Sequence, residues 1–310
     1  MFTYIVVFLT TLLFFYASEK SRSKVIENIT SILSILIISI FAGIRDNTVG
    51  TDVGVYGERF YDYAVNSPNF GQLKQILTTT GETNDMLFHV MNYSLSRFSS
   101  NYHVGLFFYE LVTVSVVYIA FRRIKTRYDI SITLGMFFFL FTMFNPSLNL
   151  MKQIMAVSIT FLAMTFLINH EYKWYFAFIL VAFFIHGSAL IGIPIYLVFK
   201  IFEDSKIGNN SNKLLAFLVF AILTVVAMYF VSGVVGWLVS KGIVRTNYLN
   251  YLSGGTYSLN ASINFFSLIL PCFSIIHLSV LYNKATREIV DNSFWISITI
   301  LSTITSFATL

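Results

Sequence analysis

Two cationic side chains and a histidine stand next to apolar stretches of the chain, where polar groups are costly. Arg45 directly follows an apolar segment, Lys152 lies near the start of another, and His186 separates two more. Fixed Arg and Lys donors can neutralise the charge of a pyrophosphate leaving group. A His with a pKa near neutrality can act as a general base toward a hydroxyl. These side chains therefore suit a reaction on an anionic substrate at a membrane surface.

Arg45 opens an unusually polar stretch, "GIRDNTVGTDVGVYGERFYDY", which runs from Gly43 to Tyr63. Asp46 and Asp52 follow the arginine, and the stretch carries glycines at 43, 50, 54 and 57. A plain exit from a helix needs neither these acids nor this much backbone freedom. The stretch therefore predicts a functional site. The structural alternative is an Arg45 that snorkels to lipid headgroups.

The stretch "FNPSLNLMKQIMA" places a second cation at a helix start. Asn145-Pro146 predicts a turn, after which Lys152-Gln153 begin the next helix. A Lys in this position opposes the helix dipole, but with the free N–H groups of the first turn it makes an anion site. Contact with lipid headgroups is again the structural alternative.

His186-Gly187-Ser188 forms a tight connection between two apolar segments. A buried His costs free energy unless it is hydrogen-bonded, and a structural His remains the alternative to a catalytic one. Arg245, in the later polar stretch 240–261, is a weaker candidate for the same group of cations.

Composition sets the class of protein. Of the 310 residues, 56% are hydrophobic and 11% are charged, whereas soluble domains carry about 25% charged residues. We therefore predict an all-α polytopic integral membrane protein. The net charge of +5 then reflects the basic residues that set the orientation of a membrane protein. We therefore expect no nucleic-acid partner. We also expect no metal or other cofactor, because no ligand motif is present and Cys272 is the single cysteine.

About ten apolar segments are long enough to count as transmembrane or near-transmembrane helices in one domain, 1–310. If the N-terminus lies outside, most of the 20 Lys and Arg residues fall in short inner loops. The outer side then holds a large loop, 45–102, and a second loop, 240–261. Helical spacing of apolar residues over 84–98 predicts a short interfacial or re-entrant helix in the large loop. The last segment stops at Leu310 while still apolar, so either the chain ends flush with the outer surface or further sequence follows. The ten segments are 2–17, 26–44, 103–121, 130–145, 151–168, 174–185, 188–200, 214–239, 262–282 and 293–310.

Three short motifs together resemble the EpsG/Wzy family of polysaccharide polymerases, over about residues 1 to 285. They are "AGIRDNTVGTDVGVY", "MKQIMAVSITFLA" and "FIHGSALIGIP", in the family's order and spacing. Two positions depart from the family pattern. Asp46 replaces the usual aromatic residue, and Lys152 replaces an Arg, which keeps the charge but loses bidentate phosphate binding.

The resemblance implies a reaction and a set of roles. A growing glycan would move from undecaprenyl pyrophosphate to the sugar of a second lipid-linked repeat unit, on the outer face of the bacterial inner (plasma) membrane. A chain-length regulator is a further candidate partner, besides the membrane lipid. Arg45, Lys152 and Arg245 would hold the pyrophosphate, His186 would take the proton, and Asp52 would orient Arg45 or the sugar. Residues expected to contact substrate beside them are Tyr56, Asn145, Gln153 and Ser188.

Other functions stay open at this level. A ligase that moves finished glycan to another acceptor would use the same outer cations, and only its product separates it from a polymerase. A transporter of lipid-linked glycan would need polar residues along a path through the membrane, whereas Glu110 is the main polar residue found there. An acyltransferase would need a His pattern of its own.

Overall fold

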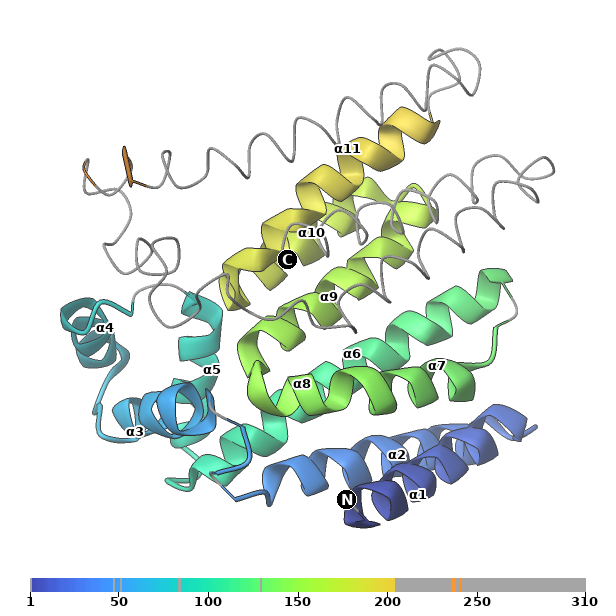
Figure 1. Cartoon of the computed structure of the whole chain (residues 1–310), viewed down its shortest axis with the longest axis horizontal. Helices are drawn as coiled ribbons and strands as arrows, with labels where there is room; N and C mark the ends of the chain where they lie inside the picture. The colour runs from blue at the N-terminus through green and yellow to red at the C-terminus, as the bar shows by residue number, and fades with distance from the viewer. Residues whose placement is uncertain are drawn as a thin grey trace, which may run out of the picture. The chain divides into compact units, whose positions relative to one another are not determined.

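The computed structural model describes residues 2–203, apart from 47, 51, 83, 84 and 129, together with 236, 237 and 240. All regular structure in this part of the chain is helical (Figure 1). Within the described residues, five segments are long and apolar enough to cross a membrane, as expected for a polytopic helical membrane protein. They are α1 (Phe2–Lys20), α2 (Lys24–Gly43), α6 (Tyr102–Tyr128), the run Ile132–Asn149, and α9 (Met151–Ile168).

Shorter apolar helices follow α9. They are α10 (Tyr172–Ile185), a 3-10 turn, η3 (Gly187–Ile191), and α11 (Gly192–Glu203). The predicted segments 174–185 and 188–200 correspond to them. The predicted segments 214–239, 262–282 and 293–310 lie essentially outside the described residues, so the count of ten stays a prediction.

Contacts divide the chain into two units, Met1–Gly192 and Ile193–Leu310. The prediction of one transmembrane domain is not tested by this division. In the first unit, α1 packs on α2, α2 on α6, α6 on α9, and α9 on α10. Arg45, Lys152 and His186 all lie in this first unit.

The run Ile132–Asn149 corrects one prediction. It consists of α7 (Ile132–Phe138), a π-helical segment η2 (Phe139–Met143) and α8 (Phe144–Asn149). Asn145-Pro146 was predicted as a turn but lies inside this run, and the chain breaks at Leu150, where φ is −89° and ψ is 52°. A proline ring clashes with the carbonyl four residues earlier in a regular α-helix. The wider π turn before Pro146 alters that carbonyl's hydrogen bonding, so the helix continues to Asn149.

The large loop 45–102 is folded into short helices that gather at one end of the bundle (Figure 1). The predicted helix over 84–98 is confirmed as α5 (Met86–Ser96). Phe60 and Phe88 are fully buried against residues of α6 and α9, so the loop is docked on the bundle by apolar contacts. The other loop helices are η1 (Val53–Glu58), α3 (Arg59–Val65) and α4 (Phe70–Thr79).

Candidate functional site

Arg45 fastens the end of α2 to the joint between α8 and α9. Its two terminal nitrogens donate to the carbonyl of Ala42 and to the carbonyl of Leu148, each at 2.9 Å, and one also lies 3.3 Å from the sulfur of Met151. The residue is only 8% exposed. Both carbonyls lie near helix ends, where backbone acceptors lack partners in their own helix. Arg45 thus supplies donors that the helices cannot.

The buried carboxyl group of Glu110 acts electrostatically on Arg45. Glu110 in α6 is 3% exposed, and the Ser147 hydroxyl lies 3.0 Å from each of its carboxylate oxygens. Burial lowers the pKa of Arg45, and the charge of Glu110 acts in the opposite direction. Because an arginine stays protonated even when buried, Arg45 needs such a compensating charge. This arrangement encloses the guanidinium and directs it toward the protein.

Gly50 lets the polar loop pass close to the α8–α9 joint. Its φ is +100°, and a Cβ at this position would lie 2.8 Å from the carbonyl oxygen of Leu148. Two residues later, the backbone N–H of Asp52 donates to Oδ1 of Asn149 at 3.2 Å. Gly54 has no such neighbour within 4 Å. Of these two glycines, Gly50 is the one that the local backbone requires.

We expect Gly50→Ala to destabilise the docked loop by about 1–3 kcal/mol, because it combines a left-handed backbone with a steric clash. The matched change Gly54→Ala should have little effect. Thermal unfolding of the detergent-solubilised protein would measure both. Equal unfolding temperatures for the two variants would contradict the role assigned to Gly50.

Lys152, in the first turn of α9, lies in an aromatic cage. Its Nζ atom is 4.4 Å from the ring centre of Tyr56, 5.5 Å from that of Phe60 and 5.7 Å from that of Phe88. Nζ also lies 2.7 Å from Oδ2 of Asp85, and the two charged side chains are 13% and 14% exposed. Ring faces and a carboxylate both stabilise an ammonium group. The cage therefore holds one positive charge at the N-terminal end of α9.

Asp85 is the site residue that sequence reasoning missed. It precedes α5 with a left-handed backbone, φ 59° and ψ 42°, and its side chain makes no capping hydrogen bond to that helix. An Asp before an apolar helix is normally interpreted as an N-cap. The sequence therefore gives no sign that this residue has another partner. Only the fold shows that its carboxylate turns to Lys152 instead.

His186 ends α10 in extended conformation, as the sequence predicted for a break at this point. Its Nδ1 atom accepts the backbone N–H of Ser188 at 3.2 Å and lies 2.9 Å from the Ser188 hydroxyl. An Nδ1 that accepts a hydrogen bond carries no proton, so the neutral ring carries its proton on Nε2. His186 thus offers a donor to a ligand from its other side.

Electrostatics connect these groups into one site. Burial lowers the pKa of His186, the charge of Asp85 raises it, and the charge of Lys152 lowers it. Burial raises the pKa of Asp52, and Lys152 opposes that shift. Lys152 therefore lies within electrostatic range of Asp52, Asp85 and His186. We call these four residues the polar site.

The remaining predicted residues divide into three groups. Tyr56 and Ser188 contact the polar site, through Lys152 and His186 respectively. Gln153 is half-buried beside Lys152, whereas Asn145 is exposed on α8. Arg245 and the loop 240–261 lie outside the described residues, Ser240 excepted. Within the described residues, no three His, Cys, Asp or Glu side chains converge as metal ligands would.

The helices and the polar site define a multi-span membrane protein with a charged centre where a docked loop meets the bundle. A model of the EpsG family matches residues 28–310. The chain therefore belongs to the EpsG family, which connects it with polymerase-like functions on polysaccharides. No curated protein and no solved structure matches the chain significantly.

Proposed function

We propose that the protein is a membrane glycosyltransferase that polymerises a lipid-linked glycan. In this proposal it transfers the growing chain from undecaprenyl pyrophosphate to a second lipid-linked repeat unit, at the outer face of the bacterial inner membrane. The observation that carries the proposal is the polar site, in a chain of the EpsG family. In this site a caged lysine pairs with Asp85 and lies within electrostatic range of Asp52 and His186.

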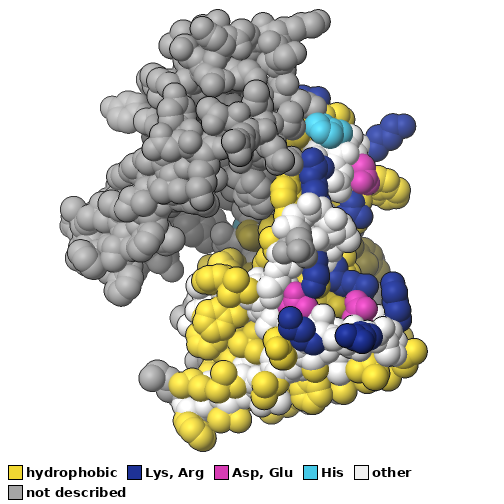
Figure 2. Space-filling model, turned by 90° about the vertical axis from the view of Figure 1, so that its right-hand side faces the viewer, with side chains coloured by type: hydrophobic (Ala, Val, Ile, Leu, Met, Phe, Trp, Pro, Cys, Tyr) yellow, Lys and Arg dark blue, Asp and Glu magenta, His cyan; other side chains and the backbone are white. Residues whose placement is uncertain are grey.

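The distribution of charge supports the orientation. Figure 2 looks onto the end of the bundle where α1 and α6 finish and α2 begins, and Lys and Arg side chains gather there. They include Lys20, Lys24, Arg122 and Lys125. Basic residues favour the cytoplasmic side of a membrane. The polar site lies at the opposite ends of these helices, which supports an outer location for it.

The geometry supports particular roles for the site residues. An ammonium group has three N–H donors, so Lys152 can bind a phosphate oxygen while keeping its contact with Asp85. The Nε2–H of His186 can donate to the same pyrophosphate. Both donors favour the charge that develops on the leaving group as the bond between the sugar and the pyrophosphate breaks.

The attacking hydroxyl needs a proton acceptor, and we assign this role to Asp52. Sequence reasoning gave it to His186, but the Nδ1 atom of that ring already accepts the Ser188 N–H and its Nε2 atom carries a proton. Asp52 is half-buried, and burial raises the pKa of its carboxyl group. A carboxylate with a raised pKa is a better base. As the acceptor oxygen bonds to the anomeric carbon, its proton passes to Asp52 and the pyrophosphate leaves with the bonding electrons.

A polysaccharide gel tests the proposal. The gene is deleted and replaced by the wild type or by His186→Ala, and membrane levels of the protein are measured beside the surface glycan. We expect a ladder with the wild type, and single repeats in the deletion strain and with His186→Ala. Loss of all glycan from its acceptor in the deletion strain would indicate a ligase. A deletion strain with an unchanged ladder, or with repeats retained inside the cell, would refute polymerisation, and the latter would favour a transporter.

A further inference from the structure

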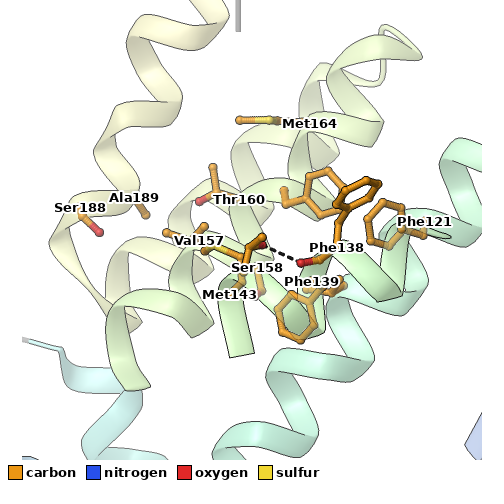
Figure 3. A pocket seen from close by; sticks show the side chains of 14 residues that line it. Phe121, Phe138, Phe139, Met143, Val157, Ser158, Thr160, Met164, Ser188 and Ala189 are labelled. Atoms are coloured by element: carbon orange, nitrogen blue, oxygen red, sulfur yellow. Dashed lines mark hydrogen bonds between the residues drawn. The ribbon is translucent and has the colours of Figure 1, made fainter. Parts of the chain in front are cut away.

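An apolar pocket of about 400 Å³ lies among the helices of the bundle and reaches Ser188, which contacts His186. Its walls come from α6, from α7 and η2, from α9, and from the turn η3 (Figure 3). Ligand pockets commonly measure about 300–1,000 Å³. Phe138 and Val157, on two facing walls, are 57% and 41% exposed, so the pocket opens at the side of helices that are long enough to span a membrane.

The lining offers almost nothing for a polar ligand to bind. Three lining hydroxyls donate within their own helices, from Ser158 to the Ile154 carbonyl, from Thr160 to the Ala156 carbonyl and from Thr142 to the Phe138 carbonyl, at 2.6–2.9 Å. The rest of the wall is mostly aliphatic and aromatic. A hydrocarbon chain is the occupant that such a wall favours.

One residue connects this pocket to the polar site. Ser188 lines the pocket, and its backbone N–H and hydroxyl both contact Nδ1 of His186. One edge of the pocket therefore lies next to His186, a residue of the polar site. A ligand that fills both must carry an anionic head directly on a hydrocarbon tail.

We propose that this pocket holds the first isoprene units of the polyisoprenyl tail of the lipid-linked substrate, with its pyrophosphate at His186 and Lys152. This inference rests on the proposed function and deepens it. Burial of the tail contributes the same binding energy before and during the reaction. Binding of the tail places the pyrophosphate next to Lys152 and His186. A blocked pocket should therefore weaken substrate binding more than it slows the chemical step.

Two substitutions of valine by tryptophan provide a matched test. Val157 lies in the pocket wall on α9, whereas Val181 on α10 is equally exposed, at 41%, and does not line the pocket. Purified variants in proteoliposomes are photolabelled with a diazirine-bearing polyisoprenyl pyrophosphate, and polymerisation of the extracted lipid-linked repeat unit is measured beside it. We expect Val157→Trp to reduce labelling and raise KM at least about tenfold, with kcat changed less. Val181→Trp should match the wild type.

Several outcomes would overturn the inference. Equal labelling of the two variants would do so, as would labelling by a diazirine phosphatidylglycerol but not by the polyisoprenyl probe, which would assign the pocket to bulk lipid. Absence of labelling by both probes would indicate that another part of the chain fills it. Because labelling does not depend on turnover, a wild type that is labelled but makes no polymer refutes the proposed function and leaves the pocket assignment standing.

Discussion

Cells carrying Lys152→Met should contain the protein in their membranes but make no long polysaccharide. Lys152 is the positive charge at the centre of the polar site, 2.7 Å from Asp85 and within electrostatic range of Asp52 and His186. In the proposed reaction, the leaving pyrophosphate would then lose a charge-assisted donor. Removal of one such donor commonly costs about a hundredfold to a thousandfold in rate. Gel analysis of the surface glycan, with immunodetection of the protein, measures this effect.

The same substitution also leaves Asp85 without its partner. Breaking a buried ion pair from one side costs up to about 3–5 kcal/mol, since a charge remains uncompensated, and the slight exposure of both side chains reduces that figure. The double variant Lys152→Met with Asp85→Asn removes both charges. We expect it to recover thermal stability and not activity. Recovery of polymer in the double variant would contradict the catalytic role of Lys152.

Lys152→Arg serves as the control for charge. It keeps the cation at the site, and the family pattern that this chain resembles carries Arg at the same point. We expect this variant to retain a ladder, with shifts in length or yield because the planar guanidinium fits the ring cage differently. A complete loss with Lys152→Arg would mean that cage geometry matters as much as charge.

The apolar segments within the described residues could be predicted from the sequence because their signal is local. The segment predicted at 151–168 begins and ends at the same residues as α9, and the break at His186 fell where α10 ends. A run of apolar residues bounded by polar ones determines where a helix can lie in a membrane. The π-helical segment η2 left no comparable signal, so the run that contains Pro146 ended later than predicted.

The partners of the site residues could not be predicted, because they come from distant parts of the chain. Asp85 meets Lys152 across 67 residues, and Arg45 meets Leu148 across 103. Residue type suggested roles for Lys152 and His186, but the direction of each side chain depends on how the loop 45–102 docks. In the folded protein, Arg45 points inward and donates to helix carbonyls, whereas the sequence suggested a side chain that faces a substrate.

Because the Arg45 side chain points into the protein, we expect Arg45→Ala to lower the free energy of unfolding. We do not expect it to act directly on the reaction. The change removes the donors to two buried carbonyls, Ala42 and Leu148, and leaves Glu110 with less compensation for its charge. Each unsatisfied buried group costs about 1–3 kcal/mol, so a total loss of a few kcal/mol would deplete the folded protein. Arg45→Lys should recover part of it, since an ammonium reaches fewer of these acceptors.

A surface arginine gives the comparison for this test. Arg122 lies at the other end of the bundle, 3.3 Å from Glu27, with side chains 43% and 28% exposed, and exposed pairs of this kind contribute about 0–1 kcal/mol. Arg122→Ala should therefore unfold near the wild-type temperature in detergent, and Arg45→Ala well below it. A protein with Arg45→Ala that unfolds like the wild type but makes no polymer would contradict the structural role. In that case the guanidinium would have to leave its carbonyls and bind substrate directly, as the sequence alone suggested.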